Sequence, residues 1–129
     1  MEGHRAALGG MMVGVDLIEV KRIKEAVVRF GERFLGRVFT PEERAYCLKK
    51  PDPYPSLAAR WAAKEAFMKA VGTRWGKGIQ WTDIEVTLKD GKPHLVLRGR
   101  ALEVSRRRQA EVSLSHTRSY AVAVVLVTF

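Results

Sequence analysis

The chain has 129 residues, 47% of them hydrophobic and 9% aromatic, which is typical of one globular domain and excludes a disordered chain. Its single cysteine, Cys47, excludes an intrachain disulfide and a Cys-based zinc cluster, and fits a reducing cytoplasmic compartment. Lys and Arg outnumber Asp and Glu by 23 to 14, a net charge of +9. Such a surface attracts polyanions, whether nucleic acid, an anionic membrane, a phosphorylated cofactor or an acidic protein.

The first segment, residues 1–11, lacks the apolar stretch of a signal peptide, and we expect a disordered extension or a misassigned start there. The remainder, residues 12–129, is expected to form the domain. No apolar run approaches the roughly 20 residues of a membrane span, so we expect no membrane partner.

The domain begins with an apolar, partly β-branched run at residues 12–17, which predicts a buried strand. A helix is expected at residues 18–30, with its inner side formed by Ile23, Val27 and Phe30. Gly31 then ends or bends this helix before a short amphipathic piece at residues 32–38.

The next helix has a clear start, because Thr40 and Glu43 form a capping box around Pro41. It is expected to run to about residue 50. Ser56 is a candidate N-cap for the helix that follows, and Gly72 a candidate left-handed stop.

The central helix, residues 58–72, is Ala-rich and leaves no wide polar face. Large apolar residues share one side, and a stripe of alanines forms a flat opposite side that another backbone could approach closely. Glu65 and Lys69 lie between these surfaces, four residues apart. Arg60 and Lys64 form a second polar stripe. A plain surface ion pair between Glu65 and Lys69 remains the alternative to a functional site.

In the second half of the chain the hydrophobic period changes from helical to two. Strands are expected at residues 84–88 and 95–97 around a turn at 89–93, and a final hairpin at 112–115 and 120–127. A short basic helix is expected at 99–108. The fold class is therefore α+β, a single domain with a long central helix packed on a small antiparallel sheet.

Two carboxylates, Asp16 and Glu65, are each embedded in an apolar segment. A buried charge there destabilises the fold unless a cation or a hydrogen-bond donor lies beside it. If the fold brings them together, two carboxylates with phosphate oxygens and water form the usual ligand set for Mg²⁺. Lys69 could then contact the same phosphates. The alternative is that Asp16 caps the following helix. His116 stands alone, as structural histidines do, and the phosphate-binding and nucleophile motifs GxxxxGK[ST], GxGxxG and GxSxG are absent.

Taken together, several segments resemble the 4′-phosphopantetheinyl transferases of the small holo-[acyl-carrier-protein] synthase type. The resemblance runs from about residue 12 to residue 127. It rests on residues 14–18 with 21–23, 29–34, 39–43, 60–70, 91–93 and 113–117. Residues 73–75 depart from the family, whose loop is usually glycine-rich there, and Trp61 stands where Phe is commoner.

This resemblance implies transfer of 4′-phosphopantetheine from coenzyme A to a serine of apo acyl carrier protein, with release of 3′,5′-ADP, in fatty acid biosynthesis. It implies Mg²⁺, with Mn²⁺ as the alternative, held by Asp16 and Glu65, with Glu65 and Lys69 as catalytic residues. Either Glu65 or a metal-bound water that it orients would accept the serine proton. Positions implied at the bound nucleotide are Arg60, Lys92, Pro93, His116 and Thr117. Lys64, Lys49 and Lys50 are weaker candidates for contact with its 3′-phosphate.

The resemblance also implies partners. Arg22 and Arg29 match the basic face that docks the acidic carrier protein, and the small members of the family are homotrimers with coenzyme A between protomers. The main rival is a basic nucleic-acid-binding module, favoured by the net charge and by the cluster at residues 106–108. Its only stacking indication is Trp75 and Trp81 beside basic residues, and it leaves the embedded carboxylates unexplained.

Overall fold

The computed structural model describes residues 10–106 and 108–128, and its strands form two antiparallel sheets. One sheet has the order β1-β5-β4, from strands β1 (Met12–Glu19), β4 (Gln109–His116) and β5 (Tyr120–Thr128). The other is the hairpin of β2 (Ile84–Lys89) and β3 (Lys92–Leu97). The remaining elements are α2 (Val20–Phe30), α3 (Glu32–Val38), α4 (Pro41–Leu48), α5 (Tyr54–Val71), the 3₁₀ turn η1 (Trp81–Asp83) and α6 (Gly99–Val104).

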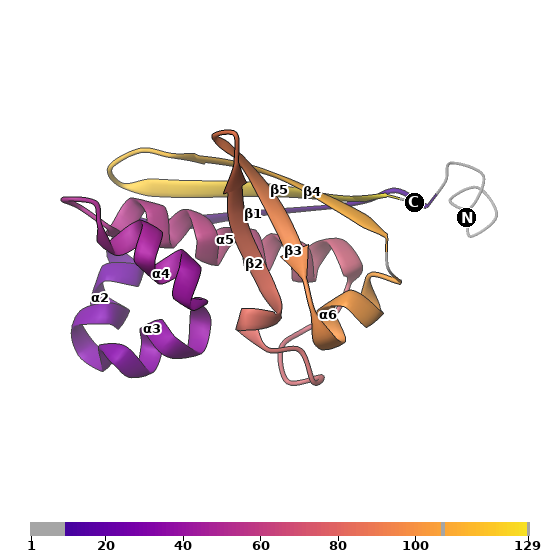
Figure 1. Ribbon diagram of the computed structural model, residues 1–129, viewed down its shortest axis with the longest axis horizontal. Helices are drawn as coiled ribbons and strands as arrows, with labels where there is room; N and C mark the ends of the chain where they lie inside the picture. The colour runs from indigo at the N-terminus through magenta and orange to yellow at the C-terminus, as the bar shows by residue number, and fades with distance from the viewer. Residues whose placement is uncertain (1–9, 107, 129) are drawn as a thin grey trace.

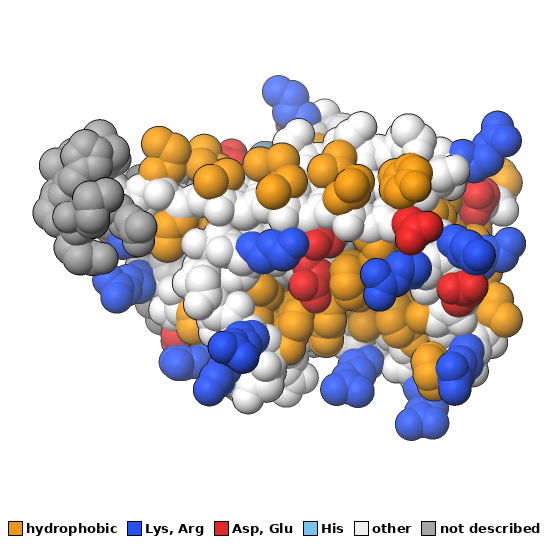
Figure 2. Space-filling model, turned by 180° about the vertical axis from the view of Figure 1, so that it is seen from behind, with side chains coloured by type: hydrophobic (Ala, Val, Ile, Leu, Met, Phe, Trp, Pro, Cys, Tyr) orange, Lys and Arg blue, Asp and Glu red, His pale blue; other side chains and the backbone are white. Residues whose placement is uncertain are grey.

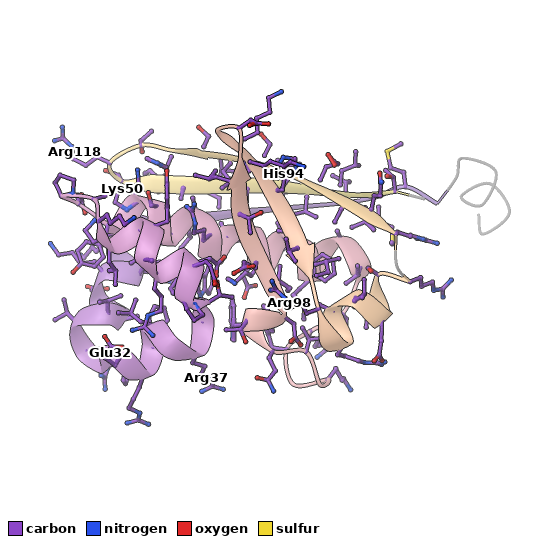
Figure 3. The ribbon with its side chains drawn as sticks, viewed as in Figure 1. Glu32, Arg37, Lys50, His94, Arg98 and Arg118 are labelled. Atoms are coloured by element: carbon purple, nitrogen blue, oxygen red, sulfur yellow. The ribbon has the colours of Figure 1, made fainter. Side chains whose placement is uncertain are left out.

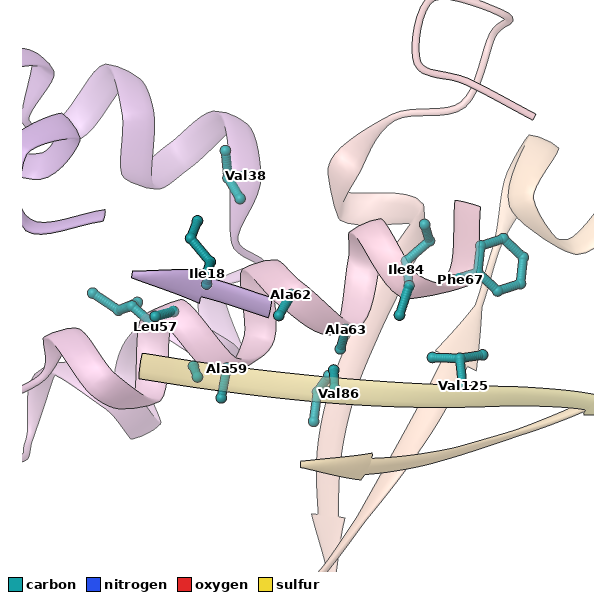
Figure 4. Close-up of a cluster of buried hydrophobic side chains, with 14 of the residues drawn as sticks. Ile18, Val38, Leu57, Ala59, Ala62, Ala63, Phe67, Ile84, Val86 and Val125 are labelled. Carbon is teal, nitrogen blue, oxygen red and sulfur yellow. The ribbon is translucent and has the colours of Figure 1, made fainter. Parts of the chain in front are cut away.

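Helix α5 is the centre of the fold. It runs along the three-stranded sheet, while the β2–β3 hairpin crosses over it and α2, α3 and α4 gather at one end (Figure 1). Figure 4 shows its buried residues meeting Ile18 of β1, Val125 of β5 and Ile84 of β2. Because neighbours surround it, α5 buries residues on nearly every side. The predicted α+β domain, with a central helix on a small antiparallel sheet, is confirmed.

The alanine stripe of α5 allows a close approach by β1, as predicted. A Cβ added at Gly14 would lie 2.0 Å from the carbonyl oxygen of Ala66 and 2.6 Å from the amide nitrogen of Ala70. Both distances are shorter than any real contact, so the β1 backbone lies directly on the α5 backbone. This contact sets the depth of Asp16, two residues further along the same strand and on the same face.

We expect Gly14→Ala to lower the free energy of unfolding by about 1–3 kcal/mol, because β1 must move away from α5 to admit one methyl group. Gly36→Ala is the matched control, since a Cβ at Gly36 meets only the side chain of Arg44, at 3.7 Å. Within α3 that change should gain about 0.5–1 kcal/mol of helix propensity. Urea unfolding followed by circular dichroism measures both variants, and equal midpoints would refute the close approach.

Several local predictions are confirmed. Thr40 and Glu43 form the capping box of α4, with Pro41 in its first turn. Gly72 ends α5 in the left-handed conformation. Asp90 and Gly91, with φ of 53° and 77°, form the two-residue turn between β2 and β3. The final hairpin is β4 and β5.

Other local predictions are wrong. Ser56 does not cap α5, because the helix already begins at Tyr54, whose amide donates to Asp52 Oδ1 at 3.2 Å. Phe30 is half exposed at the end of α2 rather than on its inner side. Helix α6 ends at Val104 instead of residue 108. Of the predicted N-terminal extension, residues 1–9 lie outside the described residues.

Candidate functional site

The fold brings Asp16, Glu65 and Lys69 together at the contact between β1 and α5. The Lys69 ammonium donates to Asp16 Oδ1 at 3.0 Å and to the Val15 carbonyl at 3.2 Å. The charge of Asp16 is close enough to Glu65 to affect its pKa. The fold therefore meets the condition set by the sequence, since two carboxylates 49 positions apart lie close to each other and to Lys69.

Both alternatives to a site are wrong in this structure. Asp16 does not cap a helix, because it lies inside β1 and the residue that precedes α2 is Glu19. Nor do Glu65 and Lys69 form a simple surface pair, because the ammonium of Lys69 is bonded to Asp16 on the neighbouring strand.

Glu65 is held in surroundings that favour its neutral form. Burial raises the pKa of its carboxyl most, and the negative charge of Asp16 raises it further. The Trp75 indole N–H, which donates to Glu65 Oε1 at 2.7 Å, and the Lys69 ammonium act in the opposite direction. The net effect is a raised pKa, so a further cation beside Glu65 would stabilise the charged carboxylate.

The carboxylates fit a divalent cation that shares its coordination with a ligand. Asp16 Oδ2 is buried and has no hydrogen-bond partner, so this oxygen is available as a ligand for a cation. In the described part of the chain, no group of three or more His, Cys, Asp or Glu side chains forms a complete metal cage. Two carboxylates completed by phosphate oxygens and water are the arrangement that Mg²⁺ prefers.

Lys64 belongs to the core and not to this site, which corrects the expectation of a cofactor contact. Its ammonium is fully buried and donates to Glu43 Oε1 at 2.9 Å, to the Trp81 carbonyl at 3.1 Å and to the Ile84 carbonyl. Burial lowers its pKa, against the opposing effect of the Glu43 carboxylate. The three acceptors use the three N–H bonds of an ammonium, so none is left for a phosphate.

Arg60 is also almost buried, so the polar stripe predicted for Arg60 and Lys64 is wrong. Its guanidinium lies 4.6 Å from the centre of the Tyr46 ring and donates to the Ser56 carbonyl at 3.3 Å, while its Nε has no partner. The ammonium of Lys50 lies 4.8 Å from the same ring. Figure 3 shows Lys50 at the end of the molecule where the β4–β5 turn carries Arg118.

The other predicted cofactor residues lie apart from the carboxylates. Lys92 and Pro93 begin β3, and His116 ends β4. Thr117 closes the β4–β5 turn, where its Oγ1 accepts from the amides of Ser119 and Tyr120. Among the described residues, no hydrogen bond or ion pair joins any of these four to Asp16 or Glu65.

The predicted partner-binding residues are free cations on the surface. Arg22 and Arg29 are exposed on α2, and within the described residues neither forms an ion pair. The guanidinium of Arg29 lies 5.2 Å from the centre of the Phe30 ring. This face of α2 therefore combines unpaired positive charge with an exposed aromatic side chain.

The tryptophans are the feature that sequence reasoning missed. Trp81 stacks on Trp75, with ring centres 3.8 Å apart, and on Trp61, with ring centres 5.4 Å apart. Trp75 and Trp81, which were the only indication of stacking with nucleic acid bases, therefore stack on other rings of the protein. The sequence did hold one indication of this contact, because residues 73–75, which include Trp75, replace the glycine-rich loop that is usual in the family.

Comparison with known proteins shows the family of this chain. Residues 12–125 match the 4′-phosphopantetheinyl transferase superfamily. A holo-[acyl-carrier-protein] synthase of Koribacter versatilis is 47% identical over 118 residues, which cover 88% of this chain and 94% of the relative. The crystal structure of the Helicobacter pylori holo-[acyl-carrier-protein] synthase in complex with coenzyme A has a TM-score of 0.81 and 31% identity, and covers 91% of this chain and 100% of that one.

A second solved structure, a holo-(acyl-carrier-protein) synthase of Bacillus anthracis in complex with CoA (3′,5′-ADP), has a TM-score of 0.76 and 34% identity. It covers 91% of this chain and 95% of that one. Both solved relatives thus resemble almost the whole length of this chain.

Proposed function

Since the chain belongs to the 4′-phosphopantetheinyl transferase superfamily and is a holo-[acyl-carrier-protein] synthase, we propose that it modifies an apo acyl carrier protein with the arm of coenzyme A. The serine hydroxyl of the carrier attacks the β-phosphorus of coenzyme A. A Ser Oγ–phosphorus bond forms, the bond from that phosphorus to the oxygen bridging to the α-phosphate breaks, and 3′,5′-ADP leaves. The observation that carries the proposal is the pair Asp16 and Glu65, partly buried beside Lys69, with Asp16 Oδ2 unpartnered.

Asp16 and Glu65 would hold Mg²⁺, or Mn²⁺ in its place, and the bound cation would draw negative charge onto the pyrophosphate oxygens. Lys69 is more than half exposed beside Asp16, so its ammonium is free to turn toward charge that develops on the departing nucleotide. The serine proton goes to Glu65 or to a water that Glu65 orients. Burial, and then the charge of Asp16, raise the pKa of Glu65 in the absence of a cation, which makes its carboxylate a stronger base than that of a free glutamate.

We assign the docking of the acidic carrier protein to α2, through Arg22 and Arg29. Exposed cations without partners steer an acidic protein toward this face and align it before the chemistry. Fatty acid biosynthesis in the cytoplasm is the setting that we propose for the reaction. No helix in the described part of the chain is long and apolar enough to cross a bilayer.

Charge reversal at Arg22 should separate carrier binding from coenzyme A binding. We expect Arg22→Glu to raise KM for the carrier protein about tenfold, because it replaces an attraction by a repulsion in the docking face. The affinity for coenzyme A, measured by calorimetry, should stay near that of the wild type. Arg106→Glu, at an exposed cation after α6, is the control for net charge. An equal loss of carrier and coenzyme A binding in Arg22→Glu would refute the docking assignment.

We also propose a homotrimer, with coenzyme A between protomers. Hydrophobic side chains alternate along the outward face of β1 and are more than half exposed at Val13, Val15 and Leu17, as is Met11 just before the strand. Figure 2 shows a row of such side chains on the face behind Figure 1. A second protomer on this face would bury them and could bring Lys92, Pro93, His116 and Thr117 to the nucleotide. Sedimentation in solution should give a species of three chains.

The reaction itself is tested by incubating the protein with coenzyme A, Mg²⁺ and apo acyl carrier protein, and weighing the carrier by mass spectrometry. The carrier should gain one phosphopantetheine, and the gain should vanish when chelator removes the metal. No gain with several competent apo carriers would overturn the proposed function. Binding to nucleic acid would then be the next measurement, although the internal use of Trp75 and Trp81 weighs against it.

A further inference from the structure

The loop between α5 and η1 is anchored beside the carboxylate pair by aromatic stacking. Trp75 lies on Trp81 with an angle of 18° between the rings, and Trp81 in turn lies on Trp61 of α5 at 27°. All three rings are partly buried. Each stacked contact restricts the position and tilt of the next ring, so the indole plane of Trp75 is fixed relative to α5.

The polar edge of this fixed indole points at the reactive centre. Trp75 Nε1 donates to Glu65 Oε1 at 2.7 Å, a short bond to a charged acceptor. It is the only side-chain hydrogen bond formed by residues 73–79 in the described structure. Oε1 therefore has a protein donor, whereas Glu65 Oε2 receives no hydrogen bond from any described residue.

We propose that Trp75 is a positioning residue that orients the Glu65 carboxylate so that Oε2 and the unpartnered Asp16 Oδ2 face a divalent cation together. This inference rests on the proposed function, because it assigns Trp75 a part in the same metal site. A glutamate has three side-chain torsions, and a donor on one oxygen removes most of that freedom before the cation arrives. Partners of metal ligands act in this way and commonly alter affinity by about 10–100-fold.

Packing alone would not require the N–H group. Trp61 also stacks on Trp81, at a longer distance of 5.4 Å between ring centres, and it forms no hydrogen bond to Glu65 among the described contacts. Trp61→Phe and Trp75→Phe therefore remove the same ring atoms from the same stack, but only Trp75→Phe removes the N–H group that donates to Glu65. This gives a matched pair of variants.

The test is a titration of the full-length protein with Mn²⁺ in the presence of coenzyme A, followed by electron paramagnetic resonance of the free ion at pH 8. We expect Trp75→Phe to weaken Mn²⁺ binding about tenfold or more, and Trp61→Phe to stay within about twofold of the wild type. Trp75→His is the rescue variant. Its five-membered ring superposes on the pyrrole part of the indole and places Nε2–H where Nε1–H lies, and at this pH the imidazole is neutral.

Recovery of Mn²⁺ affinity in Trp75→His relative to Trp75→Phe would support orientation by the N–H group. Equal affinities in the Phe and His variants, or equal losses at positions 61 and 75, would overturn it, as would an unchanged affinity in Trp75→Phe. If Trp75→Phe does not fold, the comparison of Trp75→His with the wild type decides, and a tenfold loss there overturns the proposal. Mass spectrometry of the carrier protein with the wild-type enzyme tests the proposed function separately.

Discussion

Glu65→Gln should reduce phosphopantetheine transfer by at least about a hundredfold while leaving the folded structure intact, because it removes a charge and almost no volume. The amide oxygen can still accept from the Trp75 indole, so the contact seen at Oε1 survives the change. What is lost is the negative charge beside Asp16 that would hold a divalent cation. The rate is followed by mass spectrometry of the carrier protein at saturating coenzyme A.

Stability should respond in the opposite direction to activity. Burial and the Asp16 charge raise the pKa of Glu65, which means that the fold disfavours the ionised carboxylate in the absence of a cation. Neutral glutamine removes this unfavourable charge, so the melting temperature should stay level or rise when no metal is added. A group that a fold accommodates at a cost to stability is typical of a functional site.

The control is Glu103→Gln, the same chemical change at a mostly exposed carboxylate on α6 that pairs with Arg100. It should leave transfer within about twofold of the wild type, as surface changes usually do. Near-normal turnover of Glu65→Gln in Mg²⁺ would refute the role of Glu65 as a metal ligand. A collapse of folding in that variant would show instead that the carboxylate is structural.

Short-range chemistry explains why much of this fold could be predicted. The capping box at Thr40 and Glu43 spans four residues, and the left-handed end at Gly72 depends on one, so both can be recognised without tertiary contacts. Asp16 and Glu65 were recognisable for a related reason, because a charge within an apolar segment conflicts with its own surroundings. Each could be identified as a candidate before its partner was known.

Residues whose surroundings come from distant segments could not be placed in this way. The helical position of Lys64 indicates a polar stripe, but its acceptors lie on α4, η1 and β2, and they bury its ammonium completely. Trp75 follows α5 in a loop, and its contact with Glu65 depends on the stack with Trp81. Phe30 has the spacing of an inner residue, yet it lies at the last position of α2, where it stays half exposed.

The buried contact of Lys64 predicts the largest loss of stability in this chain. Lys64→Met keeps the unbranched side chain and removes the ammonium, which leaves the buried Glu43 carboxylate without its cation and takes one donor each from the Trp81 and Ile84 carbonyls. Breaking such a pair from one side costs about 3–5 kcal/mol. A domain of this kind is typically stable by about 5–15 kcal/mol, so the variant should unfold in much less urea than the wild type.

Two further variants distinguish the effect of a buried charge on stability from the effect of losing any ion pair. Arg100→Met breaks the exposed pair with Glu103, which has the same 2.9 Å nitrogen–oxygen distance as the pair of Lys64 and Glu43. Solvent screens the exposed pair, so its loss should cost under about 1 kcal/mol. Adding Glu43→Gln to Lys64→Met should recover part of the stability, because glutamine keeps the capping-box acceptor and removes the uncompensated charge. If Lys64→Met and Arg100→Met unfold at the same urea concentration, compared at equal protein concentration, the buried ammonium does not stabilise the junction of α4, α5 and β2.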